Sequence, residues 1–144
     1  MPSFSEAERS VGYLVKRVQQ GLRRRCDLAL KPTGLSMAQY ATLRALAEHP
    51  DTSAAELARL CFVTRQSLQD MLAGLRAAGL VETADAPPRG RSRSLALTGL
   101  GSRRLSAAHD AVFAVEAAML EDVSEREQRR IADVLAQCAK NLEA

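Results

Sequence analysis

Three side chains near position 65 have the types and spacing that read base edges in DNA. Arg65, Gln66 and Gln69 fall at the start of a short amphipathic segment. An arginine side chain pairs with guanine and a glutamine side chain with adenine, each through two hydrogen bonds in the major groove. Because these residues open a segment with helical periodicity, we expect them to reach bases from the first turns of a recognition helix. Further residues expected on this DNA-binding surface are Ser53, Thr64, Ser67 and Arg76.

Three arginines further along the chain form a second group. Arg89, Arg91 and Arg93 alternate within a turn that begins Ala86-Pro87-Pro88. Concentrated positive charge has little folding value, since exposed charges contribute only ~0–1 kcal/mol even when paired. A narrow minor groove, with its enhanced negative potential, gives such arginines a partner. We therefore expect Arg91 to enter the minor groove, and Arg89 and Arg93 to meet the flanking phosphates.

Two short helices have to position the first group. Ser53 and Glu56 have the spacing of a capping box, which predicts a helix start, and Thr64 can cap a second helix. Apolar residues in both segments recur at spacings of three and four, which predicts one buried face on each helix. Phe62 lies in the turn between them, where we expect its ring to pack into the core. The residues of the two apolar faces are Leu57, Leu60 and Cys61, then Leu68, Met71, Leu72 and Leu75.

A small hairpin has to position the arginines of the turn. Gly79 is placed to end the second helix in the left-handed conformation. Leu80-Val81 and Leu95-Ala96-Leu97 then predict two short strands that flank the polar segment 82–94. Two helices followed by such a hairpin have the order of a winged helix-turn-helix, in which one helix enters the major groove and the wing reaches the neighbouring groove.

The flanking segments predict longer helices. The first spans about 5–30, and the second spans 36–49, capped by Ser36 with Gln39 at its third helical position. A third opens at Thr98, and a capping box of Ser124 and Glu127 starts the last. Three of these helices carry apolar stripes, which either intertwine with a second copy or pack on their own monomer. The stripes consist of Val11, Leu14, Val15, Val18 and Leu22; of Leu105, Ala108, Val112, Val115 and Met119; and of Ile131, Val134, Leu135, Cys138 and Leu142.

Composition and charge agree with a mainly α fold that binds DNA. The 144 residues are 47% hydrophobic but only 3% aromatic, which favours closely packed helices. The net charge of +3 divides into +4 over 1–31, −2 over 32–58, +5 over 59–104 and −4 over 105–144. The basic block therefore coincides with the helix-turn-helix and wing, as expected of a phosphate-binding surface.

The sequence resembles the MarR family of bacterial transcriptional regulators over nearly its whole length. The resemblance implies a single domain over 1–144, in which 1–34 and 100–144 form a helical dimerisation region and 35–99 form a winged helix-turn-helix DNA-binding lobe. One departure is that many members carry Asp-Arg-Arg at the wing, where this chain has Arg89-Gly90-Arg91. The matching residues are Leu35-Ser36-Met37-Ala38-Gln39-Tyr40, Leu43, Leu46, Glu56-Leu57-Ala58-Arg59, Val63-Thr64-Arg65-Gln66-Ser67, Gly79-Leu80-Val81-Glu82, Arg91, Leu97-Thr98 and Gly101.

The same resemblance implies a homodimeric repressor on a pseudo-palindromic double-stranded operator, released by a small phenolic or aromatic ligand. The family's ligand cleft lies between the dimerisation helices and the DNA-binding lobe. Residues that could line it, and that fit a core equally well, are Tyr13, Arg17, Met37, Tyr40 and Met71.

Other classes of function receive less support. An enzyme is not expected, because His49 and His109 stand alone and no Gly-rich phosphate loop is present. Neither a cofactor nor a metal site is expected from three widely spaced cysteines. The absence of a signal peptide and of an 18-residue apolar run favours a cytoplasmic protein that does not enter a membrane. A winged-helix module for protein contacts remains an alternative.

A cysteine-based redox sensor is a further alternative. Cys26 follows Arg23-Arg24-Arg25, whose charge would favour the thiolate. Cys61 and Cys138 fall on apolar helical faces and are expected to be inert core residues.

Overall fold

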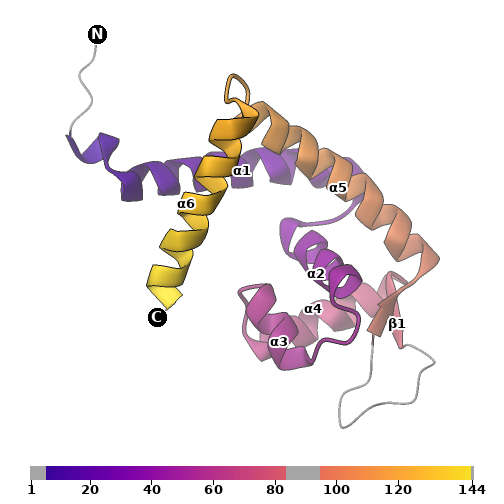
Figure 1. The fold of residues 1–144 in the computed structure, drawn as a ribbon. Coiled ribbons are helices and arrows are strands. Elements are labelled where there is room, and N and C mark those ends of the chain that lie inside the picture. Colours follow the sequence, from indigo (N-terminus) through magenta and orange to yellow (C-terminus); the bar gives the residue numbers. More distant parts are fainter. Residues whose placement is uncertain (1–5, 84–94, 144) are drawn as a thin grey trace.

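The computed structural model describes residues 6–83 and 95–143, and Figure 1 shows how its helices are arranged. Helices dominate, and the only regular strands in this part of the chain form one antiparallel pair. In chain order the elements are η1 (Glu6–Arg9), α1 (Val11–Leu30), η2 (Lys31–Thr33), α2 (Met37–Glu48), α3 (Ala54–Leu60), α4 (Arg65–Ala77), β1 (Val81–Thr83), β2 (Leu95–Leu97), α5 (Gly99–Met119) and α6 (Glu125–Glu143).

One hydrophobic core joins the long helices α1 and α5 to the group formed by α2, α3, α4 and the sheet. The long helices α1 and α5 pack against each other, and α2 contacts α1, α3, α5 and β2. Below these long helices, α2, α3, α4 and the sheet gather into a compact group (Figure 1). Leu30, Leu43, Leu68 and Leu75 are fully buried, and they come from α1, α2 and α4. The winged helix-turn-helix predicted from the sequence is therefore built on the same core as the flanking helices.

Side-chain caps fix where several helices begin. Ser36 Oγ accepts from the Gln39 N–H at 3.1 Å while Gln39 Oε1 accepts from the Ser36 N–H at 2.9 Å, which completes the predicted capping box of α2. Ser124 and Glu127 make the same two bonds at 3.2 Å before α6. Each box satisfies two backbone N–H groups that a helix start otherwise leaves unpaired.

The first helix begins later than predicted. The chain forms the 3₁₀ helix η1 and then breaks at Ser10, whose backbone is extended with φ −68° and ψ 147°. Ser10 Oγ donates to Ala7 O at 2.8 Å and accepts from the Tyr13 N–H at 3.4 Å. Because this hydroxyl both closes the preceding turn and caps the next helix, α1 starts at Val11 rather than near Ser5.

The base of the wing is fastened to the first turn of α5. β1 and β2 pair antiparallel, with Val81 opposite Leu97 and Thr83 opposite Leu95. Thr98 Oγ1 donates to Gly79 O at 2.6 Å, and the Thr98 N–H donates to Leu80 O at 3.0 Å. Gly79 adopts φ +74°, as predicted for the residue that ends α4.

The apolar stripes differ in what covers them. Ala108, Val112 and Val115 of α5 are buried against the chain itself. By contrast α6 buries none of its residues, and its stripe is 43% exposed at Ile131 and 88% exposed at Leu142. Of the two predicted arrangements, packing of the apolar stripe on its own monomer therefore applies to α5 but not to α6. Val11, Leu14, Val15 and Val18 of α1 are likewise exposed, while Leu22 packs partly against the core.

Candidate nucleic-acid interface

The start of α4 is fixed by Thr64. Its Oγ1 accepts from the Ser67 N–H at 3.0 Å and donates to Ser67 Oγ at 3.0 Å. Thr64, which was predicted as the cap, donates its hydroxyl proton to Ser67 within the helix start. The hydroxyl proton of Ser67 can therefore be donated to an acceptor outside the helix. Four backbone N–H groups at a helix start also favour a phosphate oxygen.

The outer face of α4 is polar, and the opposite face of the helix is buried in the core. Leu68, Leu72 and Leu75 are buried on its inner face, as predicted. Arg65, Gln66 and Gln69 are exposed. Gln66 Nε2 donates to Asp70 Oδ1 at 3.1 Å, so in the free protein this amide is tied to the next turn. Because the helix is held by its apolar face, these side chains are presented in a fixed order.

A groove along α4 brings three of the predicted DNA-binding residues together. Arg65, Gln69 and Arg76 line one side of a space of about 310 Å³, which we call the α4 groove. Its other walls include Thr52, before α3, and Leu95 of β2. Among residues 6–83 and 95–143, Thr52 Oγ1 is a buried side-chain oxygen without a hydrogen-bond partner. The two guanidinium groups that line this groove suit an anionic ligand with several acceptor oxygens.

Ser53 caps the start of α3, but only one of the two hydrogen bonds of the predicted capping box forms. Its Oγ accepts from the Glu56 N–H at 3.1 Å. The Glu56 carboxylate turns the other way and pairs with Arg59, whose Nε donates to Oε2 at 3.1 Å. This pairing holds the pKa of the Glu56 carboxyl below its ordinary value. An arginine one turn away competes for the same carboxylate, and the sequence spacing alone did not reveal it.

The turn between α3 and α4 differs from the prediction. Phe62 does not plug the core: its side chain is 93% exposed and its backbone has φ +57°. Cys61 and Val63 pack partly against the core instead. A left-handed residue rotates its side chain away from the direction taken by its neighbours, so the ring points outward when Cys61 and Val63 point inward.

The arginines predicted for the wing, Arg89, Arg91 and Arg93, lie outside the described residues. Only the base of the wing is described, where β1 and β2 pair from Val81 to Thr83 and from Leu95 to Leu97. The DNA contacts expected of these arginines stay predictions.

The residues predicted to line a ligand cleft are only partly brought together. Tyr13 and Arg17 line one shallow space on α1. Met37 and Met71 are half-buried against the core, and Tyr40 is buried in it. A separate space of about 300 Å³ lies between α1 and α5, and we call it the α1–α5 groove. Its lining consists of Leu14, Arg17, Val18, Gly21, Leu22, Arg25, Val115 and Met119.

The α1–α5 groove combines an apolar floor with two cations. Arg17 and Arg25 are its charged residues, and the rest of its side chains are aliphatic or Met119. Such a lining fits an aromatic ring that carries a carboxylate. Arg25 is a candidate ligand-binding residue that was not predicted from the sequence. Its position eight residues after Arg17, about two helical turns along α1, is the pattern that could have indicated it.

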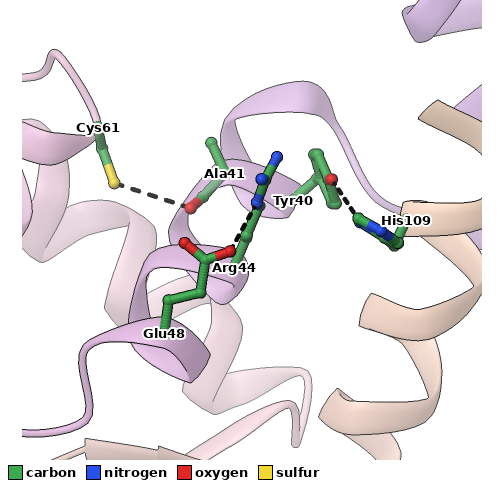
Figure 2. A network of polar contacts seen from close by, with 6 residues as sticks. All are labelled: Tyr40, Ala41, Arg44, Glu48, Cys61 and His109. Atoms are coloured by element: carbon green, nitrogen blue, oxygen red, sulfur yellow. Dashed lines mark hydrogen bonds and ion pairs between the residues drawn. The ribbon is translucent and has the colours of Figure 1, made fainter. Parts of the chain in front are cut away.

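The helix α2 lies between the end of α3 and α5 and contacts both (Figure 2). Tyr40 OH shares a hydrogen bond of 3.1 Å with His109 Nδ1 of α5. Cys61 Sγ, at the end of α3, contacts Ala41 O at 4.0 Å, and Arg44 pairs with Glu48 at 3.0 Å. His109, which was expected to stand alone, therefore joins α5 to the buried Tyr40. Its ring also lies 6.2 Å from that of Phe113.

The cysteines are placed differently from the expectation. Cys26 is 1% exposed, and burial raises the pKa of its thiol, with Glu116 and Asp27 adding to the effect. Arg23, Arg24 and Arg25 are exposed and do not offset this burial. Cys138 is exposed on α6 rather than inert in a core. Burial also raises the pKa of Cys61, which is half-buried. The surroundings of Cys26 therefore do not favour the thiolate on which the redox-sensor alternative depends.

Comparison with known proteins decides the family. The profile of the MarR family matches residues 33–92. The HTH-type transcriptional repressor Mb2911 of Mycobacterium bovis is 35% identical over 125 residues, which cover 87% of this chain and 90% of the relative. This chain belongs to the MarR family.

Solved structures of MarR proteins share the fold. Rv2887 of Mycobacterium tuberculosis in complex with salicylic acid matches with a TM-score of 0.72 and 34% identity, over 90% of this chain and 96% of that one. Rv2887 in complex with DNA gives the same TM-score of 0.72 at 33% identity, over 90% and 97% of the chains. The repressor CouR bound to a 23-mer DNA duplex matches with a TM-score of 0.83 and 26% identity, over 96% and 99%. In the described part of this MarR chain, no helix has the length and apolar character to cross a membrane.

Proposed function

We propose that this MarR protein is a homodimeric, sequence-specific repressor that binds double-stranded DNA and is released by a small aromatic acid. The observation that carries DNA binding is the α4 groove, where Arg65, Gln69 and Arg76 share one wall. In this reading 35–99 bind DNA, with Arg65, Gln66 and Gln69 at base edges. Ser53, Thr64, Ser67 and Arg76 face phosphates, and the wing arginines Arg89, Arg91 and Arg93 contact the neighbouring groove.

The exposed stripes support a second copy as partner. Ile131, Val134 and Leu135 of α6 are each more than 40% exposed, as are Val11 and Val18 of α1. Contiguous apolar surface on a soluble protein marks an interaction site. Residues 1–34 and 100–144 of two chains would bury these stripes against one another. A two-fold dimer would then read a pseudo-palindromic operator.

The α1–α5 groove supports the ligand. Its Arg17 and Arg25 can each pair with a carboxylate above the apolar floor formed by Leu22, Val115 and their neighbours. One relative, Rv2887, has been solved with salicylic acid and with p-aminosalicylic acid, which are both aromatic carboxylates. A ligand bound between α1 and α5 would change how the helices that carry the DNA-binding elements are spaced.

DNA binding is tested by selecting genomic fragments with the purified full chain and measuring affinity by fluorescence anisotropy at physiological salt. We expect a common site bound with a dissociation constant of about 10⁻⁸ M or tighter. A protein-contact module would instead bind every duplex weakly and alike. Salicylate should then release the complex, and Arg25→Gln should remove this release while leaving the affinity for DNA unchanged.

A further inference from the structure

The turn between α3 and α4 contains an apolar side chain, Phe62, that does not pack in the core. Phe62 is 93% exposed, more than Val11 at 72% or Leu142 at 88%. Its φ of +57° places it in the left-handed region. For a residue with a Cβ this conformation costs roughly 1–2 kcal/mol, which glycine avoids.

The chain uses other residue types where it needs this conformation elsewhere. In the described residues positive φ occurs at Gly34, Gly79, Asp122 and Phe62. Glycine adopts it without penalty, and aspartate tolerates it better than other residues do. Phenylalanine has neither advantage. The ring of Phe62 also adds nothing to the core, because Cys61 and Val63 fill the inward positions on either side. The large apolar ring at this position is therefore available to a partner outside the chain.

The position of Phe62 indicates which partner. It lies two residues before Thr64, the cap of α4, and three before Arg65. Its backbone N–H donates to Arg59 O at 3.2 Å and the Val63 N–H donates to Ala58 O at 3.0 Å, so the turn is held tightly to α3. Phe62 is therefore placed beside the start of α4, the helix that enters a major groove in the function proposed above. A major groove offers apolar surface in the thymine methyl groups, which phenylalanine contacts in protein–DNA complexes.

We propose that Phe62 is a DNA contact, whose ring packs on a thymine methyl group or the adjoining deoxyribose beside the start of α4. This inference rests on the proposed function, because it assigns a further residue to the same interface. The contact is apolar, so it adds affinity without neutralising a phosphate. If the contact is the methyl group, it favours thymine at one position in each half of the operator.

The test compares Phe62→Gly and Phe62→Asn with the wild-type chain. Both substitutions suit the left-handed backbone, so the free energy of unfolding should stay equal or rise. Affinity for the selected operator should nevertheless fall about tenfold, the size of one lost apolar contact. The slope of log affinity against log salt should not change, whereas losing a phosphate contact flattens it by ~0.9.

Operators with uracil in place of thymine distinguish a contact with the thymine methyl group from a contact with the deoxyribose, because uracil lacks only the methyl group. If one uracil position lowers wild-type affinity but not that of Phe62→Gly, the thymine methyl group is the contact; if none does, it is the deoxyribose. Equal operator affinity of Phe62→Gly and wild type overturns the inference. So does a loss of affinity that sedimentation traces to dimer dissociation, which would place Phe62 against a second copy. A wild-type chain that binds no duplex specifically refutes the proposed function itself, and that result is seen before any variant is made.

Discussion

Gly101 of α5 lies directly against the carbonyl group of Leu80. A Cβ atom built on Gly101 would come within 2.0 Å of Leu80 O and 3.0 Å of its carbonyl carbon. The same oxygen accepts the Thr98 N–H at 3.0 Å. Both neighbours are backbone atoms that cannot rotate away, so the close approach of Leu80, the residue before β1, to α5 requires the absence of a side chain at position 101.

Gly101→Ala should therefore destabilise the fold. Separating α5 from Leu80 by about an ångström disturbs buried packing, which typically costs 1–3 kcal/mol. Urea denaturation followed by circular dichroism measures the loss. Gly99→Ala is the matched control, because a Cβ there meets only the flexible end of Arg103 at 3.5 Å. Equal stability of the two variants would contradict the close approach.

Tyr40→Phe should lower the free energy of unfolding by roughly 0.5–1.5 kcal/mol, the net contribution of one hydrogen bond. The variant removes the bond of 3.1 Å to His109 while keeping the buried ring. Tyr13→Phe should have almost no effect, since Tyr13 is 45% exposed on α1. Thermal melts of both variants at one protein concentration make the comparison. A neutral Tyr40→Phe would mean that the link between α2 and α5 does not contribute to stability.

Gln66→Ala and Arg76→Ala should impair DNA binding in different ways. Loss of a base contact at Gln66 should relax the preference at one operator position by ~1–3 kcal/mol and leave other positions alone. Loss of a phosphate contact at Arg76 should weaken binding to all sequences and flatten the salt slope by ~0.9. Affinities for a panel of single-base operator variants at several salt concentrations distinguish them. Uniform weakening by Gln66→Ala would assign that residue to phosphate as well.

Val112→Asp and Ile131→Asp should separate folding from association. Val112 is 6% exposed within a single chain, so a carboxylate there should unfold the protein. Ile131 is 43% exposed on α6, so its variant should keep its helical circular dichroism spectrum but sediment as a monomer. The monomer should bind a half-site with much lower affinity than the dimer binds the full operator. A dimeric Ile131→Asp would exclude α6 from the interface.

Stability should decline at alkaline pH, partly through Cys26. Burial raises the pKa of this thiol in the folded state, so the folded protein holds the proton more tightly than the unfolded chain does. The stabilisation is complete below the unfolded pKa of ~8.5 and is lost as pH rises through the folded value. Cys26→Ala should flatten the dependence of the free energy of unfolding on pH in this range. Unchanged dependence would mean that Cys26 ionises equally in both states.

Local signals in the sequence predicted most of the elements. The caps at Ser36, Thr64 and Ser124 were read correctly, because each depends on residues within one helical turn. The left-handed end of α4 at Gly79 was predicted for the same reason. Ser10 was missed, since its bond to Ala7 O breaks a periodicity that otherwise runs through it.

Features that depend on distant residues could not be predicted in this way. His109 and Tyr40 are 69 residues apart, and nothing near either one indicates the other. An apolar residue between two helices is ordinarily expected in the core, and only the backbone angle of Phe62 shows that it points outward. Arg25 was passed over because a cation on α1 gains meaning only once Val115 and Met119 of α5 lie beside it.

The fastening of the wing to α5 turns that helix into a lever arm. Thr98 binds both Gly79 and Leu80, so the hairpin and the first turn of α5 move together. The 21 residues of α5 extend about 31 Å from this joint to Met119, at the lip of the α1–α5 groove. A tilt of about 5° pivoting at the Met119 end would carry the base of the wing about 3 Å across the DNA, given that length. A displacement of that size exceeds the tolerance of a hydrogen bond. In the function proposed above, a ligand that fits the groove would thus shift the base of the wing without touching it.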